Sequence, residues 1–361
     1  MSHQHITLKN HSRTTILGVT MILLLLLLAL PQAGQASPPK PIVYIGLIPD
    51  TGGIDDNSFN EMAAAGLAQA ETDFGVVGTI YPTSPENDYP TQIAACVAGG
   101  NALCITVGYS MTDATLAAAV ANPEVNFAIV DASWETYPDN LRGITFNSAQ
   151  VGYLAGTLAG LMSASNVIGA IGGFPIPPVN DFMFPYQYGA QWADPQVQVL
   201  LEYAYNFMDP DLGAQMAEDQ IARGADVIFA VAGPTGLGVN ITTAQAGKWT
   251  IGVDVDVYYT FFGGGALDGH EYLLTSAMKR VDMAVYHTIE DIVDATFTSG
   301  TMVNALANEG VGLAPYRDAA ASIPQAVQDQ VAAVAQSIMN GETDVWEPFY
   351  KYTVALPVAM K

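Results

Sequence analysis

The sequence is short of basic residues. Lysine and arginine together number 11 of 361 residues, against 35 aspartates and glutamates, and the formal net charge is −24 at pH 7. Two of the basic residues, Lys9 and Arg13, lie in the first 36 residues, which leaves 9 basic against 35 acidic residues, a net charge of −26, in the rest of the chain. A surface of this sign repels nucleic acid and anionic membranes, and it disfavours a highly anionic ligand. We therefore expect no nucleic-acid partner.

Cysteine and histidine are also scarce. The two cysteines, Cys96 and Cys104, have no histidine near them, so a four-ligand zinc site is not expected. In an oxidising compartment they could form a local disulfide, and two separate buried thiols are the alternative. Three of the five histidines lie in the first eleven residues, and neither His270 nor His287 has neighbours that suggest catalysis or metal binding. No cofactor is expected.

The motifs of common hydrolases are missing. There is no Gly-x-Ser-x-Gly elbow for a nucleophilic serine. Glycines 233, 236 and 238 resemble a phosphate-binding loop only superficially, because no Gly-Lys-Ser/Thr follows them. The sequence therefore favours a protein that is not an enzyme.

Only one long apolar run is present, and it lies at the N-terminus. Residues 16–30 are continuously apolar apart from Gly18 and Thr20, follow Lys9 and Arg13, and precede a small-residue stretch that ends at Ala36. This pattern predicts a signal peptide over residues 1–36, with a retained signal anchor as the alternative. No other run reaches the ~18 apolar residues of a membrane-spanning helix. Since this region has no cysteine for a lipid anchor, we expect an exported protein in the periplasm or at the cell surface. We also expect it to be a monomer.

The rest of the chain alternates short apolar runs with longer alanine-rich helical patterns. This alternation predicts an α/β protein with parallel sheets covered by helices on both faces. Nine or more strands is many for one open sheet, so two lobes are expected. Predicted strands lie at residues 42–48, 76–81, 103–107, 127–130, 143–146, 167–171, 197–205, 227–231 and 250–253. Predicted helices include residues 59–74, 112–121, 151–162, 212–223 and 238–246.

The order of these patterns also predicts the domain boundaries. A new helix starts just after residue 147, and a second crossing between lobes is expected after residue 256, followed by a Gly- and Phe-rich insertion at 258–269. We expect lobe 1 to comprise residues 40–147 and about 272–310. Lobe 2 should comprise residues 148–271 and about 311–361.

Residues 46–60 form the most informative segment. They read Gly-Leu-Ile-Pro-Asp-Thr-Gly-Gly-Ile-Asp-Asp-Asn-Ser-Phe-Asn, between an apolar strand and an alanine-rich helix. Asp50, Phe59 and Asn60 therefore lie at the carboxyl end of the first strand and the start of the next helix. Ligands of open α/β sheets bind at this position.

Part of this segment resembles the first aspartate motif of calcium-dependent nucleoside hydrolases, Asp-Thr-Asp-x-Gly-x-Asp-Asp. Residues 50–56 here read Asp-Thr-Gly-Gly-Ile-Asp-Asp, so Gly52 replaces the second aspartate and the glycine is displaced. Calcium needs several convergent oxygen ligands, and the loss of one weakens such a site severely. A calcium-dependent nucleoside hydrolase is kept as the alternative function.

The whole segment looks like the signature of the basic membrane protein family of ABC-transporter solute-binding proteins, which includes purine-nucleoside receptor lipoproteins. Further segments resemble this family in order, at residues 107–109, 126–131, 153–156, 168–173, 224–228, 232–238, 251–256 and 275–280. The resemblance implies a type I periplasmic-binding-protein fold, with two doubly wound parallel-sheet lobes joined by a hinge. It also implies a small-molecule ligand, a nucleoside, that is delivered to ABC permease subunits. A cytoplasmic transcription regulator of the same family conflicts with the predicted signal peptide.

The resemblance further implies how a nucleoside base is held. Phe59 and Phe207, on opposite lobes, would stack on the two faces of a flat purine. Tyr109 would line the same slot, or pack in the core instead. Asp50 and Asn60 would hydrogen-bond the edge of the base, although a turn residue and a helix cap are their alternative roles.

A second group of residues is implied for the ribose. Asp254 and Lys279 would hydrogen-bond the hydroxyls, and the backbone N–H of Gly236, at the start of a helix, would donate as well. A surface salt bridge is the alternative role of Lys279. Asp131 is expected to face the cleft from a strand end, or else to be solvated there. Asp55 and Asp56 are expected to cap the helix that follows them.

Overall fold

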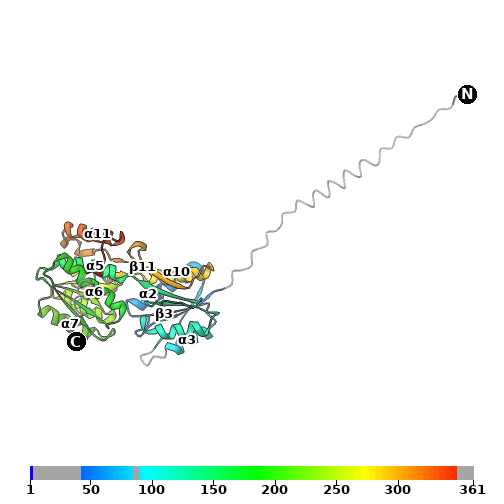
Figure 1. Ribbon diagram of the computed structural model, residues 1–361, viewed down its shortest axis with the longest axis horizontal. Coiled ribbons are helices and arrows are strands. Elements are labelled where there is room, and N and C mark those ends of the chain that lie inside the picture. The colour runs from blue at the N-terminus through cyan, green and yellow to red at the C-terminus, as the bar shows by residue number, and fades with distance from the viewer. Residues whose placement is uncertain (3–41, 84–88, 348–361) are drawn as a thin grey trace, which may run out of the picture. The chain divides into compact units, whose positions relative to one another are not determined.

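A computed structural model describes residues 1–2, 42–83 and 89–347 of the chain (Figure 1). Nearly all of the predicted signal peptide and the end of lobe 2 beyond residue 347 lie outside these ranges. None of the helices in the described ranges combines the length and the apolar character that a bilayer crossing requires.

The first sheet has, among the described residues, six parallel strands in the order β11-β5-β4-β3-β1-β2. Every residue of β3 is buried, as is typical of a central parallel strand with helices on both faces. Helices α3 and α10 pack against this strand, and α2 packs against the neighbouring strands β1 and β2 (Figure 1). The strands are β1 (Tyr44–Ile48), β2 (Val77–Ile80), β3 (Leu103–Val107), β4 (Asn126–Val130), β5 (Leu141–Phe146) and β11 (Gly300–Asn304). The helices of this lobe are α2 (Phe59–Phe74), α3 (Tyr89–Ala98), α4 (Thr112–Ala121) and α10 (Val281–Val293).

The second sheet also has six strands within the described ranges, in the order β12-β10-β9-β8-β6-β7. All neighbours are parallel except β12, which runs antiparallel to β10 at the edge. The strands are β6 (Val167–Gly172), β7 (Gln198–Tyr203), β8 (Val227–Val231), β9 (Trp249–Asp254), β10 (Leu273–Lys279) and β12 (Val311–Leu313). The helices are α5 (Ser148–Met162), α6 (Pro177–Ala193), α7 (Pro210–Ala222), α8 (Gly233–Gln245), the short α9 (Val257–Thr260) and α11 (Gln325–Met339).

The second crossing between lobes comes later in the chain than expected. Residues from about 272 were expected in lobe 1, but β10 pairs in parallel with β9 in the second sheet. The sequence pattern missed this strand because the polar residues Thr275 and Ser276 interrupt its apolar run. Both residues are nevertheless buried, and their hydroxyls form hydrogen bonds inside the protein. The Thr275 hydroxyl donates to the carbonyl of Ala314 at 2.7 Å, and the Ser276 hydroxyl oxygen accepts from the N–H of Val257 at 3.1 Å. The chain therefore crosses after Lys279, at the start of α10.

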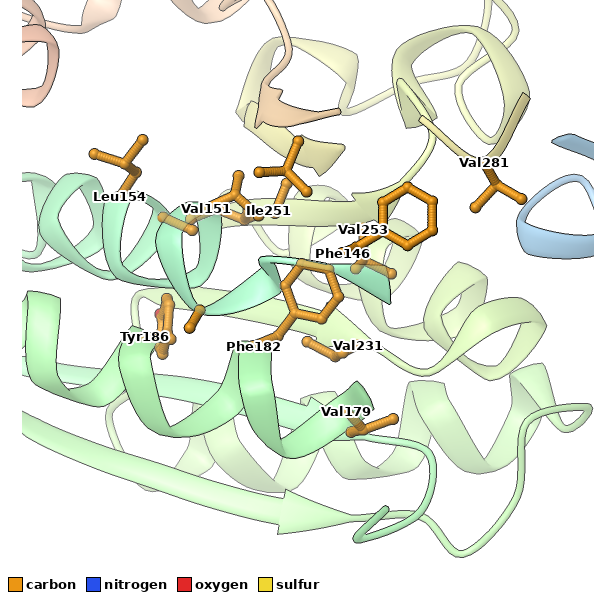
Figure 2. Close-up of a cluster of buried hydrophobic side chains, with 14 of the residues drawn as sticks. Phe146, Val151, Leu154, Val179, Phe182, Tyr186, Val231, Ile251, Val253 and Val281 are labelled. Atoms are coloured by element: carbon orange, nitrogen blue, oxygen red, sulfur yellow. The ribbon is translucent and has the colours of Figure 1, made fainter. Parts of the chain in front are cut away.

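The core of the second lobe depends on close packing between α5 and α6. Side chains from these helices, from β8 and β9, and from the crossing residues Phe146 and Val281 gather in one cluster (Figure 2). The helices approach so closely that a Cβ added to Gly156 would lie 1.9 Å from the carbonyl oxygen of Tyr186. This contact fixes α6, which carries Phe182 toward the carboxyl ends of the strands.

Cys96 and Cys104 form a disulfide, with their Cα atoms 6.1 Å apart. The bond joins α3 to β3, and both residues are fully buried. Of the two alternatives considered from the sequence, the local disulfide is therefore correct.

Candidate ligand-binding site

A cleft lies at the carboxyl ends of strands from both sheets. It encloses about 760 Å³ including its open mouth, within the ~300–1,000 Å³ range of small-molecule sites. From the first lobe it is lined by Asp50, Thr51, Asp56, Phe59, Asn60, Gly108, Tyr109, Ser110 and Asp131. From the second lobe it is lined by Ile176, Pro178, Val179, Phe182, Phe207, Met208, Val231, Gly233, Pro234, Val253, Asp254 and Lys279. The structure thus brings together every site residue expected from the sequence except Gly236.

Gly236 does not line the cleft. Its helix, α8, begins at Gly233 rather than near residue 238, so Gly236 lies one turn inside it. The N–H of Gly236 donates to the carbonyl of Ala232 at 3.3 Å, which is the internal helix bond of that turn. The expectation that this N–H donates to a ligand is therefore wrong, and Gly233 and Pro234 line the cleft instead.

The aromatic side chains of the cleft come from different lobes. Phe59 is the first residue of α2, and Phe207 lies in the loop between β7 and α7. The ring of Phe207 packs against Phe174 at a centroid distance of 5.2 Å. Tyr109 is 38 % exposed, so it lines the open part of the cleft and does not pack in the core. Phe182 on α6 adds a fourth aromatic ring, which the sequence did not single out.

At the cleft mouth the two lobes touch. Met208, from the same loop as Phe207, lies against Gly52 of the β1–α2 loop, where an added Cβ would be 2.9 Å from its Sδ atom. Gly52 has φ +112°, a conformation that favours glycine. A residue with a side chain at position 52 would therefore both strain the backbone and push Met208 away.

Asn60 and Asp56 connect the first strand to the first helix. The amide oxygen of Asn60 accepts from the N–H of Asp50 at 3.0 Å, and its amide nitrogen donates to Asp56 at 3.1 Å. The Asp56 carboxylate also accepts from the backbone N–H groups of Ser58, Asn60 and Glu61 at 2.9–3.0 Å, which confirms its expected role as a cap. This network fixes Asn60 at the cleft wall, with one amide hydrogen left over after the bond to Asp56.

The Asp50 carboxylate accepts hydrogen bonds from the β1–α2 loop and from α3. Its Oδ1 atom accepts from the N–H of Thr51 at 2.7 Å and from the Thr51 hydroxyl at 3.3 Å. The hydroxyl of Tyr89, the first residue of α3, donates to the same atom. Sequence reasoning missed Tyr89, because nothing near residue 89 marks it and only the fold brings it to Asp50.

Lys279 links the two lobes by a buried ion pair. Its ammonium lies 2.6 Å from the Asp131 carboxylate, with the side chains 3 % and 9 % exposed. The two alternatives, a surface salt bridge for Lys279 and a solvated strand end for Asp131, are therefore wrong. The same ammonium lies 4.8 Å from the ring centroid of Phe59 and 5.2 Å from that of Phe146, within range of cation–π attraction.

Asp254, the last residue of β9, and Asp131, the first residue after β4, have the same unusual backbone conformation. Their φ angles are +63° and +72°, a left-handed backbone that costs free energy in any residue but glycine. Burial raises the pKa of Asp254 to about 6, against the opposing effect of Lys279 and with the support of Asp131. Asp181 on α6 is similar, since its burial also raises its pKa to about 6. The site thus holds several acids around one lysine.

The carboxylates that suggested a calcium site are arranged differently from metal ligands. Asp50 and Asp56 direct oxygens at hydrogen-bond donors of the protein, and Asp55 is exposed. In the part of the chain that the structure describes, no group of three or more histidine, cysteine or carboxylate residues is placed to hold a metal ion.

Residues 42–347 match the family described as Bmp, ABC transporter substrate-binding protein PnrA-like. The chain belongs to this family. The resemblance drawn from the sequence motifs is therefore confirmed, and the chain is an ABC transporter solute-binding protein of the Bmp family.

Curated relatives cover most of the chain. It is 31 % identical to the ABC transporter nucleoside-binding protein BmpA of Lactococcus lactis, over 87 % of this chain and 92 % of that protein. It is 30 % identical to basic membrane protein D of Borreliella burgdorferi, over 82 % of this chain and 86 % of that protein. These Bmp relatives are named for binding or for the membrane, and neither name describes an enzyme.

Solved structures confirm the fold. An ABC transporter solute-binding protein from Aeropyrum pernix K1 matches with a TM-score of 0.75 and 26 % identity, over 84 % of this chain and 92 % of that chain. A second one, from Conexibacter woesei, matches with a TM-score of 0.65 and 25 % identity, over 84 % and 98 % of the two chains. The Bmp chain described here has the expected type I periplasmic-binding fold.

Proposed function

We propose that this chain is the exported solute-binding component of an ABC importer that binds a purine nucleoside in the cleft and delivers it to permease subunits. The observation that carries the proposal is the placement of Phe59 and Phe207. They come from different lobes and line one cleft. A flat base between them would stack on both rings, and such stacking is worth ~1–3 kcal/mol per base.

The polar groups beside these rings suit the edge of a purine. Asp50 offers a carboxylate oxygen that accepts hydrogen bonds, and Asn60 has an amide hydrogen to donate. An adjacent donor and acceptor on the base, such as the amino group and ring nitrogen of adenine, would pair with both. The nucleoside-binding name of the Lactococcus relative supports this class of ligand.

The far side of the cleft suits a ribose without a phosphate. Asp131 and Asp254 can accept from hydroxyls, and Lys279 can donate to them. Four acidic residues, Asp50, Asp56, Asp131 and Asp254, line the cleft beside this single lysine. The resulting negative field would repel a nucleotide phosphate, so a nucleoside is the expected ligand.

Transport requires that the bound state differ from the free one. A ligand that contacts Phe59 on one lobe and Phe207 on the other binds the closed arrangement more tightly than the open one. It shifts the equilibrium toward closure by this difference in binding free energy. Permease subunits would recognise the closed arrangement, and the ligand would leave chemically unchanged. Export to the periplasm or cell surface is the expected consequence of the N-terminal signal, and the exported protein is expected to be a monomer.

A ligand screen on the mature chain, residues 37–361, tests this function. Purine nucleosides should raise its melting temperature in the presence of a calcium chelator and be recovered intact. Adenosine monophosphate should bind much more weakly than adenosine at low ionic strength. Absence of binding by all purine nucleosides would refute the proposal, and release of free base with calcium would favour the hydrolase.

The stacking role predicts a contrast between two neighbouring aromatics. Phe207→Ala should weaken nucleoside binding about ten- to a hundredfold, because one face of the base loses its ring. Tyr205→Ala is the matched control, since Tyr205 is 65 % exposed in the same loop and is not among the cleft-lining residues. Isothermal titration of both variants measures the difference, and equal affinities would contradict the stacking role.

A further inference from the structure

Tyr89 acts on the cleft without lining it. It is the first residue of α3, and its hydroxyl donates to Asp50 Oδ1. Burial, and next the hydrogen bond to Asp50, raise the pKa of the Tyr89 hydroxyl above its usual range, so the group stays a neutral donor. Its ring packs against a buried cluster that includes Ile48 and Ile93.

The three donors on Asp50 all use the same oxygen. The Thr51 N–H, the Thr51 hydroxyl and the Tyr89 hydroxyl meet at Oδ1. The other oxygen, Oδ2, lies beside Gly108, where an added Cβ would be only 2.6 Å from it. Gly108 is a cleft-lining residue, so Oδ2 lies beside the wall of the cleft.

The Thr51 contacts alone do not fix this orientation. Thr51 follows Asp50 in the chain and is exposed, so it moves with the same loop. Tyr89 belongs instead to a helix that the disulfide joins to β3. Its hydroxyl is therefore the one contact of Oδ1 that comes from outside the β1–α2 loop among the hydrogen bonds described here.

We propose that Tyr89 is a positioning residue that turns Asp50 Oδ2 toward the exocyclic amino group of the base, and thereby sets a preference for amino-substituted purine nucleosides. The inference rests on the proposed function and deepens it. It predicts that the energetic effect of Tyr89 depends on whether the ligand carries that amino group.

The test is isothermal titration of the mature protein with adenosine and with purine riboside, which lacks the amino group. Tyr89→Phe should weaken adenosine binding about tenfold, the value of one hydrogen bond to a charged group, and change purine riboside binding less than about twofold. In an Asp50→Asn background the substitution at Tyr89 should no longer distinguish the two ligands. Tyr286→Phe is the matched control, because the Tyr286 hydroxyl also donates to an aspartate, Asp73, at 3.1 Å, outside the cleft.

The outcomes separate the two proposals. If wild-type protein binds adenosine but Tyr89→Phe weakens both ligands equally or neither, the positioning role is refuted and the proposed function survives. If Asp50→Asn alone keeps the wild-type ratio of adenosine to purine riboside affinity, the positioning role is also refuted, even where Tyr89→Phe does not fold. If wild-type protein binds neither ligand, the proposed function fails, and this inference with it.

Discussion

At the scale of single residues, Asp254 connects the cleft to the stability of the fold. Its pKa in the folded protein is about 6, above the usual value of an aspartate, because it is buried. Between about pH 4 and pH 6 the folded state therefore binds more protons than the unfolded state. Stability falls as the pH rises through this window, and the loss persists above it.

This linkage predicts that Asp254→Asn stabilises the ligand-free protein at neutral pH. The gain should reach up to about 3 kcal/mol above pH 7 and vanish near pH 4, because asparagine carries no charge to bury. Urea unfolding at several pH values measures it. Asp268→Asn, at an exposed position, is the control. A stability difference that does not vary with pH would contradict the prediction.

Residues of the cleft differ in how far the sequence could predict them. Phe59, Asp50 and Asn60 were predictable, because one strand–loop–helix segment places them together. Tyr89 and Phe182 were not, since each reaches the site from a helix with no motif of its own. The prediction for Gly236 was wrong because the helix was expected to begin at residue 238, whereas α8 begins at Gly233. Only the N–H groups of the first turn of a helix lack a partner inside it, and Gly236 lies beyond that turn.

At the scale of elements, the contact between α5 and α6 has no spare room. Gly156 lies against the carbonyl of Tyr186, and Gly152 and Gly189 make similar approaches in the same contact. An added methyl group must move backbone rather than a flexible side chain. Such overpacking typically costs ~1–3 kcal/mol.

Gly156→Ala should therefore destabilise the protein by at least about 1–3 kcal/mol, despite the better helix propensity of alanine. Gly312→Ala on β12 is the matched control, because an added Cβ there meets nothing within 4 Å. Thermal unfolding of both variants compares them. Equal melting temperatures would show that the helices can separate without cost.

The strands show what periodicity can and cannot reveal. Strand β8 is a continuous apolar run and β3 is interrupted only by Thr106, and both strands were predicted at their observed positions. Strand β10 was missed because Thr275 and Ser276 break its apolar run. Both hydroxyls have partners inside the protein, and such partners are invisible in a sequence.

At the scale of the whole molecule, one ion pair joins the lobes inside the cleft. Lys279 ends β10 of the second sheet, and Asp131 follows β4 of the first. Both are nearly inaccessible to water, so neither charge is solvated when the other is removed. The sequence could predict two lobes from the alternation of elements, but not which side chains meet between them.

Lys279→Met should therefore cost about 3–5 kcal/mol of stability, because it leaves Asp131 buried without a counter-charge. The double variant with Asp131→Asn should recover part of this loss. Arg223→Met is the matched control, since the Arg223–Glu202 pair is 49 % and 32 % exposed and should contribute less than about 1 kcal/mol. Urea unfolding measures all three, and a similar loss at both sites would contradict the prediction.

The cystine between α3 and β3 makes one part of the cleft sensitive to the redox environment in which the chain folds. Tyr89 begins the helix that the Cys96–Cys104 disulfide joins to β3. The hydrogen bond from Tyr89 to Asp50 therefore depends on a covalent bond that forms only under oxidising conditions. A copy of the chain in a reducing cytoplasm would keep both lobes and the side chains of Phe59 and Phe207. The orientation of its Asp50 carboxylate would be less well fixed. If the proposed positioning role holds, a thiol reductant should therefore lower the preference of the protein for adenosine over purine riboside.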